Sequence, residues 1–194
     1  MRTVVGIDAA WTLTQPSGVA LAAEGTAGWH LVAAESSYQH FLARADNGQA
    51  PEERPSGAAP DVPGLLSAAT ALGGSPVSLV AVDMPLALSP IVGRRTSDNA
   101  VSKAYGGRKC GTHSPSAQRP GQISDQLREG FHQAGFPLCT MAMATPGLIE
   151  VYPHPALVEL AGAPERLPYK AAKARKYWPS DSPPERRARL LRQW

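Results

Sequence analysis

Two near-continuous apolar runs, each ending at an aspartate, dominate the pattern of hydrophobic positions along the chain. The first, TVVGID, ends at Asp8, and the second, VSLVAVD, ends at Asp83. Apolar runs rich in β-branched residues are typical of strands buried on both faces of a parallel or mixed sheet. Such sheets place their sites at the carboxyl ends of the strands. The pattern predicts two strands that each present a carboxylate there, although two unrelated aspartates capping the following loops would give the same spacing.

Weaker apolar segments predict the rest of a β-β-β-α-β-α-β-α order. Residues 18–23 and 29–35 are joined by turn residues and form an antiparallel meander with the first run. Helical spacing over residues 62–72, stopped by Gly73-Gly74, predicts a crossover helix into the second run. We also expect a loop at 46–61, a strand at 148–152, and helices at 97–105, 122–134, 156–161, 169–178 and 185–194.

The crossover helix fixes the expected topology. It makes the strand within residues 77–87 parallel to the first strand and its neighbour. The prediction is an α/β fold with a mixed five-stranded sheet of order 3-2-1-4-5, an antiparallel meander followed by parallel strands, flanked by helices. This is the ribonuclease H-like arrangement, and we expect one such domain over residues 1–194. Asp8 and Asp83 would then lie side by side.

Composition narrows the class of protein. A chain of 194 residues with 43% hydrophobic and 18% charged residues is expected to be globular. Cys110 and Cys139, the only cysteines, are too few for a disulfide framework or a cysteine-only metal site. No apolar stretch approaches the roughly 18 residues of a membrane span. We therefore expect a cytoplasmic protein without a membrane segment.

The net charge of +3 is distributed unevenly. Residues 165–194 carry three acidic side chains and nine basic ones, so this C-terminal segment is strongly cationic. Such a segment suggests a polyanionic partner such as nucleic acid, although solvated basic helices without a partner are also common. The basic residues are Arg166, Lys170, Lys173, Arg175, Lys176, Arg186, Arg187, Arg189 and Arg192.

The paired aspartates suggest a metal site. Mg²⁺ or Mn²⁺ would suit Asp8 and Asp83, because such ions are held by one or two carboxylates plus waters and phosphate oxygens. Glu150, inside the apolar segment LIEVYPHP, is the candidate for a third ligand, with an exposed sheet edge as the alternative. His154, four residues later, would position the attacking water or contact phosphate, unless it makes a structural hydrogen bond to backbone.

The segment 91–121 is basic and rich in glycine, which suits phosphate binding. Gly106-Gly107 would let the backbone approach a ligand closely, but the phosphate-loop pattern of nucleotide-binding proteins is absent. Asp98 also fits an N-capping or first-turn position in the helix expected at 97–105. The candidate phosphate or nucleic-acid contacts are Arg94, Arg95, Asp98, Arg108, Lys109 and His113.

Four motifs in order, GIDAAW, AVDMPLA, the GRRTSD–AYGGR–THSP stretch and EVYPHPAL, resemble the family called domain of unknown function 429. Its members are usually described as predicted nucleases of the ribonuclease H-like superfamily, and the resemblance runs from about Thr3 to Trp178. It implies that Asp8, Asp83 and Glu150 match the family's acidic positions. It further implies that a polar motif after the second acidic strand is matched by Arg94, Arg95 and Asp98.

Members of that family usually continue into a C-terminal helix with an Asp-rich segment, of the kind that supplies the last metal ligand in this superfamily. No Asp lies beyond Asp181 in this sequence. Three alternatives follow for the expected single domain and its C-terminal helix: the chain is naturally short, it is a fragment, or its metal site is incomplete.

Three functions remain open on these grounds. The leading hypothesis is a metal-dependent nuclease that hydrolyses phosphodiester bonds through its strand-end carboxylates. The second is a non-catalytic nucleic-acid or anion-binding module with an incomplete metal site. A small-molecule phosphotransferase or hydrolase is less favoured, because Ala-Ala-Trp follows Asp8 in place of a glycine-rich phosphate turn and the domain has no second copy.

Overall fold

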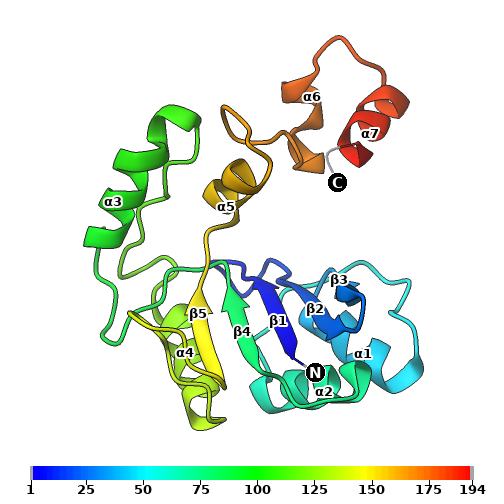
Figure 1. Cartoon of the computed structure of the whole chain (residues 1–194), viewed down its shortest axis with the longest axis vertical. Helices are drawn as coiled ribbons and strands as arrows, with labels where there is room; N and C mark the ends of the chain where they lie inside the picture. The colour runs from blue at the N-terminus through cyan, green and yellow to red at the C-terminus, as the bar shows by residue number, and fades with distance from the viewer. Residues whose placement is uncertain (1, 193–194) are drawn as a thin grey trace. The chain divides into compact units, whose positions relative to one another are not determined.

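The computed structural model describes residues 2–192, which group into two compact units (Figure 1). The sheet unit comprises residues 2–95 and 114–151, and the C-terminal unit comprises residues 96–113 and 152–192. Whether the two units act as the one domain expected from the sequence stays a prediction. The final two residues of the helix expected at 185–194 lie outside the described part of the chain.

Five strands form one mixed sheet in the order β3-β2-β1-β4-β5, visible in Figure 1. β1 pairs antiparallel with β2 and parallel with β4, β2 pairs antiparallel with β3, and β4 pairs parallel with β5. This confirms the predicted topology, which is ribonuclease H-like. The strands are β1 (Thr3–Asp8), β2 (Gly18–Gly25), β3 (Gly28–Glu35), β4 (Leu79–Val82) and β5 (Gly147–Glu150).

One face of the sheet carries the hydrophobic core. Successive side chains of a strand point to opposite faces, so in β1 Val5 and Ile7 are buried while the alternate residues are not. Three helices pack on the buried face and contribute Phe41, Leu65 and Phe131 to the same core cluster. They are α1 (Tyr38–Asn47), α2 (Val62–Gly73) and α4 (Gln122–Gln133).

The predicted crossover helix is confirmed as α2, and its ends follow from local chemistry. Asp61 caps its N-terminus by accepting a hydrogen bond from the backbone N–H of Gly64 at 3.1 Å. Its C-terminal cap is Gly74, whose φ of 67° lies in the left-handed region that glycine adopts without strain. β4 is shorter than the apolar run that predicted it, since Pro85 has no N–H to extend the pairing.

The sequence did not predict α1. Its buried residues are Tyr38, His40 and Phe41, so two of the three positions that face the core carry polar atoms. The apolar pattern is therefore weak. Ser37 nevertheless begins the helix by accepting a hydrogen bond from the N–H of His40 at 3.1 Å.

The C-terminal unit is built from α3 (Thr96–Tyr105), α5 (Pro153–Leu160), α6 (Ala174–Tyr177) and α7 (Pro183–Leu191). The helix expected at 169–178 is only a 3₁₀ turn, Ala171–Lys173, followed by the four-residue α6. Lys170, Lys173 and Lys176 stand three residues apart, and like charges at this spacing oppose a continuous helix. Across residues 2–192, none of the helices combines the length and the hydrophobicity of a membrane span.

Candidate functional site

Asp8 and Asp83 occupy neighbouring positions at the carboxyl edge of the sheet. Asp8 is the last residue of β1, and Asp83 directly follows β4. Ile7 is in register with Val82, and the backbone N–H of Asp83 donates to the carbonyl of Ile7 at 2.8 Å. The ladder thus continues to the two aspartates, which stand on adjacent strands about 4.8 Å apart in backbone spacing.

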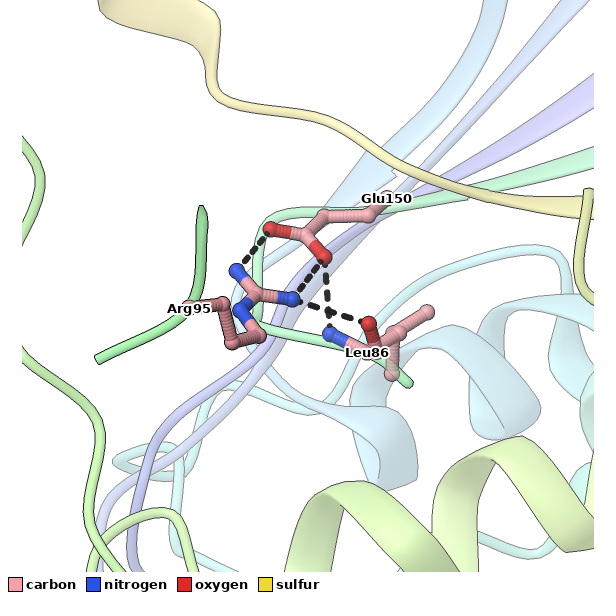
Figure 2. Close-up of polar contacts among 3 residues, drawn as sticks. All are labelled: Leu86, Arg95 and Glu150. Atoms are coloured by element: carbon pink, nitrogen blue, oxygen red, sulfur yellow. Dashed lines mark hydrogen bonds and ion pairs between the residues drawn. The ribbon is translucent and has the colours of Figure 1, made fainter. Parts of the chain in front are cut away.

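Glu150 makes a different set of contacts. Figure 2 shows its carboxylate facing the guanidinium of Arg95, whose Nη1 and Nη2 donate to Oε2 and Oε1, both at 2.6 Å. The same carboxylate accepts the backbone N–H of Leu86 at 2.8 Å, while Arg95 also donates to the carbonyl of Leu86 at 2.8 Å. Such two-pronged, charge-assisted contacts are strong and directional. In this arrangement Glu150 and Arg95 hold the loop that follows β4.

The register of the sheet indicates on which face Glu150 and the two aspartates lie. Val82 pairs with both Ile7 and Glu150, and residues paired in parallel strands lie on the same face. Glu150 therefore belongs to the face that carries Ile7 and Val82 in the core. Asp8 and Asp83 each follow one of these buried residues, so the alternation directs them to the opposite face.

Two carboxylates on adjacent strand ends fit one Mg²⁺ or Mn²⁺, since water and substrate oxygens complete the coordination of such ions. Within residues 2–192 no group of three or more His, Cys, Asp or Glu side chains is placed to hold a metal. Metal binding by Asp8 and Asp83 therefore stays a prediction. The expectation that Glu150 is a third ligand stays a prediction.

The two arginines expected to contact phosphate have contacts within the sheet unit. Arg95 is 17% exposed and bound to Glu150. Arg94 is exposed, and its Nη1 donates to the hydroxyl of Ser114 at 2.9 Å. The contacts of both arginines therefore lie where the chain leaves the sheet unit after residue 95 and returns to it at residue 114.

In the C-terminal unit, the two cations of the glycine-rich loop are also engaged. Arg108 forms an ion pair with Glu159 and donates to the carbonyl of Ala163 at 2.6 Å. Lys109 pairs with Glu165, with both side chains about half exposed or more. Arg108 thus connects the loop after α3 to the chain after α5. The exposed Lys109 pair contributes little to stability.

Asp98 lies in the first turn of α3, as the sequence predicted, and is 3% exposed. Its backbone carbonyl accepts a hydrogen bond from the hydroxyl of Thr112 at 3.1 Å, and the N–H of Thr112 donates to Ser102 at 3.0 Å. These contacts fasten the 106–113 loop against α3. A buried first-turn position fits a structural role for Asp98, while His113 at the end of this loop is exposed.

His154 sits in the first turn of α5 and is only 5% exposed. Its Nδ1 lies 2.9 Å from the hydroxyl of Tyr169, and the ring of Tyr152 packs edge-on with centroids 5.3 Å apart. Burial, reinforced by the positive charges of nearby cations, lowers the pKa of His154 to about 4. The imidazole is therefore neutral at pH 7. Its expected role beside the aspartates, which belong to the other unit, stays a prediction.

The cations that depress this pKa are the functional candidates that residue-by-residue sequence reasoning missed. They are Arg166, Lys170 and Lys173, in decreasing order of effect. The sequence contained one signal of them, the excess of basic residues after position 165. It did not reveal that the charges of these three residues act on one buried histidine.

The sheet order, its mixed direction and the acids at the ends of β1 and β4 define a ribonuclease H-like α/β protein. More narrowly, the chain belongs to the family described as protein of unknown function (DUF429), whose model matches residues 6–194. This confirms the resemblance carried by the four sequence motifs. No curated protein and no solved structure matches the chain.

Proposed function

We propose that this protein is a divalent-metal-dependent nuclease with Asp8 and Asp83 as its metal ligands. The observation that carries the proposal is the position of the two aspartates at adjacent, hydrogen-bonded ends of parallel strands. Asp8 is exposed and Asp83 is half-buried, so both positions are accessible from solvent. Two carboxylates at such neighbouring positions concentrate negative charge that a divalent cation offsets.

The bound metal would supply Lewis-acid stabilisation of charge on phosphate oxygens. The protein's own residues then have two tasks. Asp8 and Asp83 hold the ion at the edge of the sheet. Glu150 and Arg95 keep the loop after Asp83 in place, because they fasten both the N–H and the C=O of Leu86.

The charge distribution supports nucleic acid as the substrate. The C-terminal unit, taken over the full sequence as residues 96–113 and 152–194, has twelve Lys and Arg against five Asp and Glu. The remainder of the chain has seven Lys and Arg against eleven Asp and Glu. A unit with net charge +7 attracts a polyanion and raises its local concentration beside the protein.

A non-catalytic nucleic-acid-binding module is the second candidate. It is favoured by the engagement of both carboxylate oxygens of Glu150 with Arg95, which leaves two acids where a two-metal site usually needs three. In that case the fold and the cationic unit would serve binding alone.

The test combines metal binding with turnover on the full chain. Mg²⁺ and Mn²⁺ are titrated calorimetrically into the wild type, into Asp8→Asn/Asp83→Asn, and into the matched control Asp46→Asn. Asp46 is an exposed aspartate in the last turn of α1. The same samples are assayed on labelled single-stranded and double-stranded DNA and RNA.

The nuclease proposal expects metal binding and cleavage in the wild type and in Asp46→Asn, and loss of both in the double variant. Metal-independent binding of nucleic acid without cleavage would establish the binding module instead. Cleavage that persists in the double variant would remove the two aspartates from the mechanism.

A further inference from the structure

Three cations of the C-terminal unit flank Tyr169 in the chain, and Tyr169 contacts the buried His154. The backbone N–H of Lys173 donates to the carbonyl of Lys170 at 2.9 Å, so these two lysines stand on one turn of the chain. The rings of His154 and Tyr169 lie 5.4 Å apart between centroids, and their polar atoms are 2.9 Å apart. Arg166, Lys170 and Lys173 are all close enough to disfavour a positive charge on His154. The three residues and this aromatic pair are called the cation cluster below.

Among the described residues, some cations of the unit are neutralised by carboxylates, whereas those of the cation cluster are not. Arg108, Lys109 and Arg189 each form an ion pair with a carboxylate. In the part of the chain that the structure describes, Arg166, Lys170 and Lys173 form none. The unit thus leaves three neighbouring positive charges without a carboxylate.

This arrangement opposes the stability of the unit on its own. The charge of Arg166, followed by burial and the charges of Lys170 and Lys176, lowers the pKa of Lys173. Mutual repulsion of this kind is relieved when an anion binds, because the bound charge offsets each cation at once. A concentration of cations beside polar groups in one small region is a typical phosphate-binding arrangement.

The character of the neighbouring residues favours a nucleic-acid backbone over a lipid surface. Residues 170–176 read KAAKARK and contain no large hydrophobic side chain. Membrane-surface segments need apolar side chains that enter the headgroup region, in addition to cations. Arg166 to Lys173 spans eight residues, so its charges suit successive phosphates of a chain rather than one small anion.

We propose that Arg166, Lys170 and Lys173, which flank Tyr169 of the His154–Tyr169 pair, bind phosphate groups of a nucleic-acid backbone. The site is separate from Asp8 and Asp83 and requires no metal. Binding at this site can therefore be tested without cleavage. Backbone binding is thereby assigned to residues other than Arg95, Arg108 and Lys109.

The first test measures binding by fluorescence anisotropy of a labelled single-stranded oligonucleotide, in EDTA so that metal plays no part. The full-length wild type is compared with Lys170→Gln/Lys173→Gln and with the matched control Lys103→Gln/Arg187→Gln. The control removes the same charge from two exposed cations of the same unit. Each protein is titrated at several salt concentrations.

The cluster variant is expected to lose at least about tenfold in affinity at low salt. Its salt dependence should fall by about 1.4 in the slope of log K against log [salt], since each contact to a single strand contributes about 0.7. The control should change both quantities much less. Equal losses in the two variants would overturn the proposal, because the binding would then follow net charge alone.

The second test reads the cluster directly through the NMR signal of the His154 ring. Bound phosphates would offset the cations around the imidazole, so the oligonucleotide should raise the pKa of His154. An unchanged pKa in the bound protein would overturn the proposal. So would complete competition by millimolar inorganic phosphate, which would indicate a small-anion site, or equal binding to vesicles of anionic lipid.

Discussion

Glu150 shows at the level of one residue how far a sequence pattern can indicate chemistry. The sequence predicted a polar role for this side chain, because an acid inside an apolar strand needs a partner, and proposed a metal. The structure supplies Arg95 and the N–H of Leu86 as partners. The residues around Glu150 do not indicate whether the partner of its carboxylate is a metal ion or an arginine 55 positions earlier in the chain. Only the register with Val82 shows which face Glu150 occupies.

Replacing Glu150 by Gln tests this structural assignment. The variant keeps an acceptor for Leu86 but removes the charge that Arg95 binds, so we expect the free energy of unfolding to fall by about 1–2 kcal/mol. Urea denaturation measures the change. Glu129→Gln, which removes a partly exposed pair with the adjacent Arg128, should shift stability by less than about 0.5 kcal/mol.

The same variant separates the two roles considered for Glu150. If its carboxylate serves only Arg95 and the loop, calorimetric binding of Mg²⁺ to the folded variant should match that of the wild type. Loss of metal binding in a folded Glu150→Gln protein would return this residue to the set of metal ligands.

His154 predicts a pH dependence of stability. Its folded-state pKa of about 4 lies below its ordinary value of 6.5, so the unfolded chain binds more protons between these values. Stability from this group is therefore present above pH 6.5 and is lost as the pH falls toward 4. At pH 4.5 the loss should reach about 2 kcal/mol. His154→Gln should show a smaller loss between pH 7 and pH 4.5 in urea denaturation, and an identical loss would contradict the assignment.

At the scale of elements, prediction succeeded where local chemistry and tertiary packing agree. α2 combines apolar residues at helical spacing with an N-capping Asp61 and a terminal Gly74, and each signal is legible in the sequence. The five strands were found for the same reason. α1 was missed because burial of Tyr38 and His40 depends on what packs over them, which no local pattern reports.

The N-terminus of α2 offers a direct measurement at this scale. Asp61→Ala removes the hydrogen bond to the N–H of Gly64 and should cost about 1 kcal/mol of stability. Asp61→Asn retains an accepting oxygen and should remain within a few tenths of the wild type. Thermal or urea unfolding of both variants would decide this, and equal destabilisation would mean that charge rather than capping is what matters.

At the scale of the whole molecule, charge and chemistry are divided between the two units. The sheet unit carries the paired aspartates, and the C-terminal unit carries the excess of cations and the cation cluster. The sequence showed the basic C-terminal segment, but it did not show that residues 96–113 join the same unit. That association depends on contacts such as Arg108 with Glu159, which are distant in the chain.

Hydrogen–deuterium exchange on the intact protein should reveal this division. With a single-stranded oligonucleotide in EDTA, peptides that cover residues 152–177 should exchange more slowly, because ligand binding disfavours local opening. Peptides from β1 and β4 should be unaffected until Mg²⁺ is added. Slower exchange confined to the sheet unit would contradict the cation cluster as the binding site.

The hydrogen bond from Arg94 to Ser114 has a consequence for how the length of the chain can vary. It joins the two ends of an excursion that leaves the sheet unit after residue 95 and returns at residue 114. The ion pair between Arg95 and Glu150 likewise joins the first of these ends to the point where the chain leaves the sheet unit again, after residue 151. Because the two ends of this segment are held together, each doubling of its length adds only roughly 0.6 kcal/mol to the free-energy cost of closing the loop. The sheet unit can thus accept longer or shorter segments between these anchors while its acidic edge keeps its form.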